Sequence, residues 1–240
     1  MKSAPRGALL ALLAVLIAGA AIGFAGMRSR SSPIVERPQA ERPTLLLLTS
    51  LPLLFNEDFS LSGGGSPALK RLQSRYRVLP ISVTSTSELA KARLLMMAQP
   101  QAQTAENLVK LDEWVRGGGR VLLFADPILE WPSKRPLGDV TRPSPMFADT
   151  GLLQHWGVRL DAPDRRDPAE RRLRNYTVST ISPGTLRGTC SIARDGLEAE
   201  CRLGDGRAII VADADLLDVA NDADPNLDAM LSELARLESK

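Results

Sequence analysis

Three aspartates are the residues best placed to do chemistry in this sequence. Asp126 directly follows the apolar run RVLLFA, and Asp213 and Asp215 close the run GRAIIVADAD. If both runs are parallel strands, their carboxylates meet at one edge of the sheet, where open α/β sheets bind ligands. Three carboxylates would suit a metal such as Mg²⁺. We favour the plainer interpretation, in which Asp215 caps a helix, Asp126 begins a turn at Pro127 and Asp213 accepts hydrogen bonds from a loop.

Other catalytic chemistry has little support in the sequence. A nucleophile needs a base beside it, and His155 is the only histidine. It stands next to Trp156 on a short expected helix, which favours a packing or surface role. One histidine and two cysteines are too few for a His/Cys metal cluster. We therefore predict that the protein is not an enzyme and that it has no catalytic residue, bound metal or cofactor.

Two glycine-rich stretches invite comparison with a phosphate cradle, which needs glycines after a strand and before a helix. Gly117–Gly119 have the opposite placement: they end a helix and precede a strand, so we predict a corner with positive φ. The stretch SGGGS, Ser62–Ser66, has the right order. It lacks a Gly-Lys-Ser/Thr ending, however, and Lys70 falls a turn inside the following helix. A flexible loop is favoured there over an anion site.

The two cysteines occupy a predicted hairpin, TCSIARDGLEAECRL. A two-residue turn at Asp195–Gly196 would place Cys190 directly opposite Cys201, at a hydrogen-bonded position of the ladder. The Cα atoms would then lie about 5.5 Å apart, which suits a disulfide. Two buried thiols are the alternative. A disulfide would indicate an oxidising compartment.

The segments that position these residues alternate between strand and helix. Four short apolar runs predict strands (TLLLLTS, RVLPISV, ARLLMMAQ and RVLLFAD), and helices are expected between them at PALKRLQSRY, near Ser87–Lys91 and at TAENLVKLDEWVR. Thr104 is the expected N-cap of the last of these helices. Such alternation is typical of a parallel sheet with helices on its faces.

After Asp126 the pattern changes. Residues 127–148 hold five prolines and predict a long loop. A short helix, DTGLLQHWGV, follows with Asp149 or Thr150 as its cap. APDRRDPAERRLR is expected to be a charged loop, either solvated or in contact with acidic lipid or an acidic partner. Asp224 caps a final amphipathic helix. The predicted fold is an α/β three-layer sandwich with a mostly parallel central sheet and a C-terminal antiparallel hairpin, preceded by one transmembrane helix.

The N-terminus predicts a membrane anchor. Residues 7–26 carry no charge and would span about 30 Å as a helix, the thickness of the hydrocarbon core of a bilayer. We favour an uncleaved anchor over a cleaved signal peptide because the apolar run is long. The expected organisation is an anchor at 1–28, a polar tether at 29–42 and a folded domain at 43–240. It would place the protein in a bacterial inner membrane, single-pass, with its C-terminal domain in the periplasm.

Charge and composition narrow the range of partners. The chain has 30 basic and 28 acidic residues, so it lacks the basic field of a nucleic-acid binder. Aromatic residues make up 4% of the chain, too few to expect stacking platforms for bases. We therefore predict no nucleic-acid partner.

Three segments together resemble a known family: LLMMAQPQAQTAENLVKLDEWVRGGGRVLLFADP, then GLLQHWGVRL, then GRAIIVADADLL. They resemble the auxiliary domain of GldG-type ABC transport systems, which is related to the glutamine-amidotransferase-like fold. The resemblance covers most of Thr44–Val219. It implies a membrane-anchored, extracytoplasmic and non-catalytic protein that accompanies transporter subunits. The amidotransferase nucleophile is missing here, which agrees with a binding role.

Overall fold

A computed structural model describes residues 35–55, 65–136, 138–139 and 141–239. The expected anchor at 7–26, the first residues of the expected tether and most of the SGGGS loop lie outside these residues. Over the described ranges, no helix has the length and apolar character needed to cross a membrane. The described end of the expected tether packs on the domain, since the Arg37 N–H donates to the Ser74 carbonyl and the Arg37 side chain pairs with Glu238.

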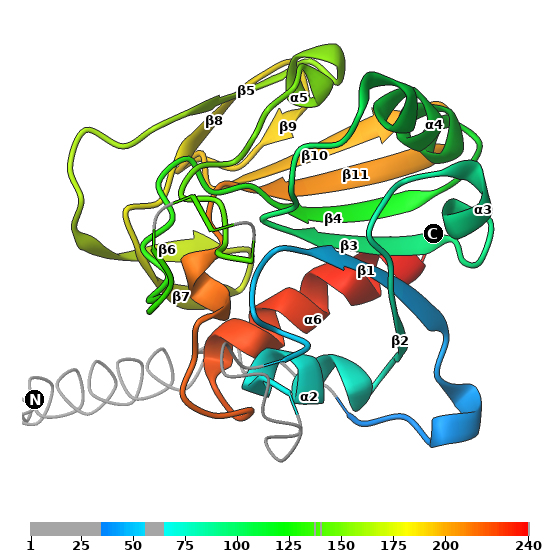
Figure 1. The fold of residues 1–240 in the computed structure, drawn as a ribbon, viewed down its shortest axis with the longest axis horizontal. Helices are drawn as coiled ribbons and strands as arrows, with labels where there is room; N and C mark the ends of the chain where they lie inside the picture. Colours follow the sequence, from blue (N-terminus) through cyan, green and yellow to red (C-terminus); the bar gives the residue numbers. More distant parts are fainter. Residues whose placement is uncertain (1–34, 56–64, 137, 140, 240) are drawn as a thin grey trace, which may run out of the picture. The chain divides into compact units, whose positions relative to one another are not determined.

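A seven-stranded sheet forms the centre of the domain (Figure 1). Its order is β2-β1-β3-β4-β11-β10-β9; the first five strands are parallel, and β10 and β9 continue the sheet in antiparallel fashion. The prediction of a mixed α/β fold with a largely parallel sheet is confirmed. The strands are β1 (Thr44–Thr49), β2 (Arg77–Pro80), β3 (Leu94–Ala98), β4 (Arg120–Phe124), β9 (Ser191–Ile192), β10 (Glu198–Leu203) and β11 (Gly206–Val211).

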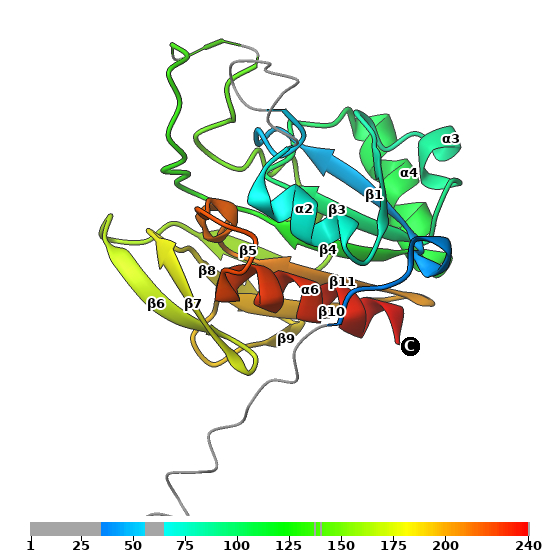
Figure 2. The ribbon, with the colours of Figure 1, turned by 90° about the horizontal axis from the view of Figure 1, so that it is seen from below.

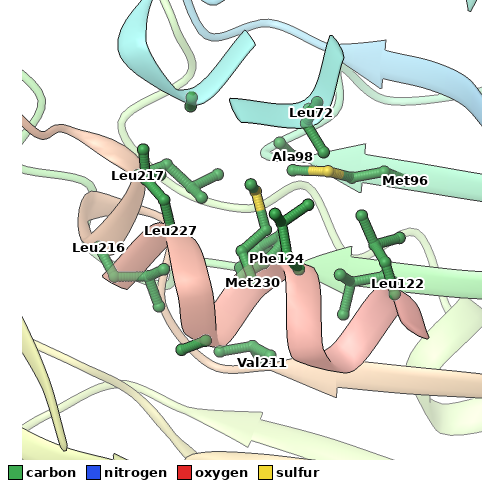
Figure 3. Close-up of a cluster of buried hydrophobic side chains, with 14 of the residues drawn as sticks. Leu72, Met96, Ala98, Leu122, Phe124, Val211, Leu216, Leu217, Leu227 and Met230 are labelled. Atoms are coloured by element: carbon green, nitrogen blue, oxygen red, sulfur yellow. The ribbon is translucent and has the colours of Figure 1, made fainter. Parts of the chain in front are cut away.

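Helices cover both faces of this sheet because its central strands are apolar on both faces. In β1, Leu45 and Leu47 face one hydrophobic cluster, whereas Leu46 and Leu48 face the other. The first cluster contains residues of α2 (Pro67–Gln73) and α6 (Pro225–Glu238), with Leu72, Leu227 and Met230 among them (Figure 3). The second contains residues of α3 (Thr86–Leu89), α4 (Ala105–Arg116) and α5 (Leu152–His155).

Side-chain caps and a glycine corner set the bounds of the long helices. The Thr104 side chain caps α4 by accepting from the Asn107 N–H, and Asp224 caps α6. After α4, Gly118 has φ +102° and leads directly into β4, so the predicted corner is confirmed. The start of α5 differs from expectation. Gly151 is its N-cap, while Asp149 accepts from the N–H groups of Gly151 and Leu153.

Two further antiparallel pairs correct the expectation of a charged loop. The segment expected to be a loop contains β6 (Pro168–Leu173), which pairs with β7 (Tyr176–Ile181). A second pair joins β5 (Val158–Asp161) to β8 (Thr185–Gly188). β6 alternates between exposed and more buried positions and ends at the fully buried Leu173. Its charged residues mask that period of two, which is why the strand was mistaken for a loop.

Candidate functional site

The carboxyl ends of β4 and β11 form the candidate site. These strands are parallel neighbours, and Phe124 is paired with Val211 at their last positions. Asp126 and Asp213 therefore leave adjacent strands at the same distance beyond that pair. Asp215 follows two residues later, at the start of the 3₁₀ helix η3 (Asp215–Leu217). The structure thus brings acids from the ends of two adjacent strands to one edge of the sheet, as the sequence indicated.

Backbone N–H groups donate hydrogen bonds to both carboxylate oxygens of Asp126. Oδ1 accepts from the Ile128 N–H at 2.9 Å, and Oδ2 accepts from the Ala214 N–H at 2.9 Å. The first bond makes the turn that the sequence predicted after β4. The second bond ties this turn to the end of β11. Asp126 is fully buried, so these bonds compensate for the loss of water around its carboxylate.

Asp213 and Asp215 exchange the roles expected for them. Asp213 Oδ1 accepts from the Leu216 N–H at 2.8 Å, which supports the first turn of η3, while its Oδ2 accepts from the Thr180 hydroxyl on β7. Asp215 makes no cap hydrogen bond, contrary to expectation. Its Oδ2 accepts from the Glu130 N–H at 2.9 Å, far away in the sequence.

Burial raises the pKa of all three carboxyl groups. It raises the pKa of Asp126, and it raises that of Asp213 well above its ordinary value, with the nearby charge of Asp126 adding to the effect. Burial also raises the pKa of Asp215 to about 7, against the opposing hydrogen bond from Glu130. The three acids are therefore close enough to repel one another electrostatically.

Gln99 is a residue of this edge that the sequence reading missed. It follows β3, is fully buried and has φ +43°, which is unusual for a residue other than glycine. Its side-chain amide brackets Asp126: Oε1 accepts from the Asp126 N–H at 2.9 Å, and Nε2 donates to the Asp126 carbonyl at 3.2 Å. Its only signal in the sequence is weak: it is a polar residue between a buried strand and Pro100.

Together these groups fasten a long loop to the sheet edge. We call residues 127–148 the proline-rich loop. It is held near its start by Asp126 and Asp215, and near its end by bonds from Gln99 to the Ser144 carbonyl and from the Phe147 N–H to the Asp126 carbonyl. Among the described residues, no three His, Cys, Asp or Glu side chains are grouped so as to hold a metal. The arrangement thus holds a loop in place and leaves both Asp126 oxygens engaged.

His155 belongs to a different contact, between α4 and α5. Its Nε2 lies 3.2 Å from Asp112 Oδ2, and Trp156 Nε1 donates to Asp112 Oδ1 at 2.9 Å. Although partial burial acts to raise the pKa of Asp112, hydrogen bonds from Arg116, Trp156 and His155 hold it below its ordinary value. His155 is therefore one of three donors gathered around a carboxylate, and its side chain is 58% exposed, in agreement with a surface role.

The structure describes only the end of the SGGGS stretch, Gly65 and Ser66. Ser66 Oγ accepts from the Leu69 N–H at 3.1 Å and so caps α2, with Pro67 in the first turn as predicted. Lys70 is exposed. The glycines at 63 and 64 lie outside the described residues, so the expectation of a flexible loop rather than an anion site there stays a prediction.

Cys190 and Cys201 form a disulfide in the structure, with their Cα atoms 4.9 Å apart. The predicted register is confirmed, because Ile192 pairs with Ala199 and Ser191 with Glu200.

The predicted turn of this hairpin is wrong. Only Gly196 has positive φ, and its N–H donates to the Ala193 carbonyl within a longer loop. The Ala193 N–H donates to Glu198, which makes that pair hydrogen-bonded and, by alternation along the ladder, puts Cys190 and Cys201 at a non-hydrogen-bonded position. Side chains lie closer together at such positions, which agrees with the disulfide and its Cα separation of 4.9 Å.

Solved structures with a similar fold are distant in sequence. The mmIFT52 N-terminal domain is 14% identical with a TM-score of 0.51, over 82% of this chain and 98% of that domain. The exo-β-1,4-mannosidase Op5Man5 from Opitutaceae bacterium strain TAV5 is 14% identical with a TM-score of 0.45, over 81% of this chain and 34% of the enzyme. A β-galactosidase from Bacillus circulans sp. alkalophilus is 13% identical with a TM-score of 0.48, over 82% of this chain and 31% of the enzyme.

These likenesses concern the fold alone. The chain spans about a third of the length of these two glycosidases. No curated protein matches the sequence significantly. A family model does match it, over residues 42–173, more than half of the chain. The matched residues include β3, α4, the glycine corner and β4, as well as Asp126, which follows β4. The protein therefore belongs to the family described as the ABC-type uncharacterized transport system, in its auxiliary branch.

Proposed function

We propose that this protein is a membrane-anchored accessory of an ABC-type transport system, which recognises other subunits through its extracytoplasmic domain and catalyses no reaction. Family membership supports the association with a transport system. The anchor is the predicted helix at 7–26, and the Cys190–Cys201 disulfide favours an oxidising compartment outside the cytoplasm.

One observation carries the non-catalytic part of the proposal: the acids at the sheet edge already serve as acceptors for the protein's own backbone. Asp126 uses both oxygens to bind N–H groups, and Asp213 uses one for an N–H and one for a hydroxyl. A general base or a metal ligand needs a lone pair directed at a substrate or an ion. At Asp126 and Asp213 each carboxylate oxygen instead accepts a hydrogen bond from a segment that the acid holds in place.

The same edge supports a role in recognition. The proline-rich loop has both ends fixed, and between them it presents apolar side chains such as Met146, which is 63% exposed. A loop held on a rigid scaffold is a common place for binding residues. Fixing its ends lowers the entropic cost of ordering it when a partner binds.

Affinity purification from native membranes tests the association. The full-length chain carries a C-terminal tag and is expressed from its own locus, cross-linked in intact cells and solubilised in detergent. We expect an ABC-type ATPase and permease to be enriched over a tagged control that consists of residues 1–42 alone. Equal recovery with the control and with the full chain would contradict recognition by the domain.

Protease treatment of spheroplasts tests the topology separately. We expect the tagged domain to be digested in intact spheroplasts, while a cytoplasmic marker survives. A domain that resists protease until the cells are lysed would overturn the extracytoplasmic placement, whatever the purification shows.

A further inference from the structure

A groove lies between the β6–β7 hairpin and the outer edge of the central sheet, away from the edge acids. Its volume is about 580 Å³. Figure 2 shows the hairpin beside β9 and β10, and hydrogen bonds link the two parts, from the Arg172 N–H to Asp195 and from Arg174 to Glu200. The lining comes from β6, from β9 and from the turn after β9.

The outer edge of β6 is an unpaired strand edge. On the far side of the hairpin, the Asn226 side chain of α6 bonds both the N–H and the carbonyl of Ser179 in β7. These two backbone groups of Ser179 therefore point away from β6. Ser179 is the partner of Glu170, and the N–H of Glu170 must accordingly point away from β7, toward the groove. Among the described residues, this N–H has no acceptor. β6 therefore offers a backbone donor to an incoming strand.

The next outward donor on β6 shows which chemistry fits this edge. The Arg172 N–H also points away from β7, and the carboxylate of Asp195 accepts from it at 3.2 Å. The other Asp195 oxygen accepts from the Leu197 N–H at 3.2 Å. An acidic side chain of the protein itself thus already occupies one of the two outward N–H groups of β6.

The charges around the groove favour an acidic occupant. Arg171, Arg172 and Arg194 line it, and in the described part of the chain none of them is paired with a carboxylate. Of the lining acids, Glu198 is paired with Arg174 and Arg236, and Asp195 is bound by N–H groups. That leaves Glu170 as the one lining acid without a partner among the described residues. Among the described residues, the lining charges without an oppositely charged partner are therefore three cations, Arg171, Arg172 and Arg194, and two anions, Glu170 and Asp195.

We propose that this groove binds an extended, acidic segment of a partner protein, which adds to β6 as a new strand. Main-chain bonds to the Glu170 N–H and to the outward β6 carbonyls would fix the register, and Arg171 and Arg194 would pair with acidic side chains. The inference deepens the proposed function by naming a surface and a partner chemistry. Its test uses a peptide rather than a transporter, so the two can fail independently.

Fluorescence anisotropy measures the binding. The probe is a labelled eight-residue peptide of alternating glutamate and valine, and the protein is the full-length chain in detergent. We expect the affinity to fall by about tenfold in the double variant Arg171→Glu/Arg194→Glu and to weaken as salt is added. Arg202→Glu is the matched control, because Arg202 is exposed on β10 and does not line the groove. A peptide of alternating lysine and valine should not bind.

Two substitutions at one position separate strand addition from charge attraction. Glu170→Pro removes the outward N–H without breaking a bond to β7, and proline is tolerated on edge strands. We expect it to weaken peptide binding by about fivefold. Glu170→Ala keeps the N–H and removes the unpaired acid, so it should bind at least as tightly as the native chain. Unchanged near-ultraviolet circular dichroism would verify the fold of each variant.

Three outcomes would overturn the proposal. The first is a peptide affinity that the double arginine variant leaves unchanged. The second is equal binding by Glu170→Pro and Glu170→Ala, which would exclude main-chain pairing. The third is binding to phosphatidylglycerol vesicles that depends on the same arginines while the acidic peptide fails to bind, because it would assign the groove to a lipid surface.

Discussion

The domain contains two groups of three carboxylates, and the structure treats them in opposite ways. We call Asp126, Asp213 and Asp215 the edge acids, and Glu198, Glu200 and Glu233 the α6 acids. The edge acids are bound mainly by neutral N–H groups. The α6 acids are bound by guanidinium groups, with Arg236 in contact with all three.

The difference appears in the titration of Glu200, whereas the fully buried Glu233 has a raised pKa, as the edge acids do. Burial raises the pKa of every edge acid, because neutral donors only partly offset the loss of water and the repulsion between the acids. Glu200 is also partly buried, but Arg236, Arg207 and Arg174 hold its pKa below the ordinary value. A cluster of acids is therefore not a site by itself: what surrounds the acids decides whether they stay charged and what they can bind.

Removing the shared cation should have the largest effect. Arg236→Met keeps an apolar stem but leaves the buried Glu198 and the partly buried Glu200 without this partner. Breaking a buried ion pair on one side costs about 3–5 kcal/mol, and we expect the free energy of unfolding in urea to fall by that amount. Arg236→Lys, which keeps the charge, should lose less. A loss below about 1 kcal/mol for the methionine variant would show that the α6 acids do not depend on it.

Removing the disulfide should destabilise the region of β9 and β10 and leave the region of the edge acids unchanged. Cys201 lies on β10, the strand that carries two of the α6 acids. The double variant Cys190→Ala/Cys201→Ala should lose roughly 2.5–3 kcal/mol of stability, from the loop that the bond closes. Hydrogen exchange should accelerate at the amides of β9 and β10 and stay unchanged at Ala214. Equal acceleration at both places would mean that the two regions unfold as one unit.

Neutral replacement of an edge acid should be tolerated better than truncation. Asp213→Ala leaves the buried Leu216 N–H and the Thr180 hydroxyl without their acceptor, which costs about 2 kcal/mol. Asp213→Asn keeps an acceptor, and since the pKa of Asp213 is raised well above the ordinary value, its cost should be below about 1 kcal/mol. Chemical denaturation at pH 6 measures both. Equal losses would show that the charge itself, not the acceptor, is needed.

The last effect is a slope in the dependence of stability on pH. Burial, followed by the charge of Glu198, raises the pKa of Glu233 to about 8. The folded protein thus keeps a proton on Glu233 that the unfolded chain loses near its ordinary pKa of about 4.3. Stability should fall as the pH rises between those two values, because the folded protein holds a proton that the unfolded chain has released. Glu233→Gln should flatten this slope, and an unchanged slope would exclude Glu233 as its source.

Much of the fold could be predicted because its signals are local. Continuous apolar runs marked the buried strands, and Thr104, Asp224 and the glycine corner marked helix ends. The sequence does not reveal β6, because the adjacent Arg171 and Arg172 fall on its two opposite faces and mask the period of two. The turn at Asp195–Gly196 was assigned the wrong length, since the Asp-Gly pair fits more than one loop.

The candidate site could be predicted only in outline. Strand order brings Asp126 and Asp213 to one edge, and the pattern of apolar runs indicated that much. The partners of Asp213 and Asp215 come from other segments: Thr180, which binds Asp213, lies on β7, and the Glu130 N–H, which binds Asp215, belongs to the proline-rich loop. Such long-range contacts leave no periodic trace in the sequence, so the exchange of roles between Asp213 and Asp215 could not be foreseen.

Ligand-dependent melting tests the central claim most directly, namely that the edge acids hold the protein together rather than act on a substrate. The melting temperature of the full-length chain is measured with Mg²⁺, Ca²⁺ or ATP at millimolar concentration, beside an Asp126→Asn variant. The account predicts shifts below about 1 °C for both chains. A ligand present at a hundred times its Kd would add about 2.7 kcal/mol, or roughly 5–10 °C. A shift of that size that Asp126→Asn abolishes would contradict the account.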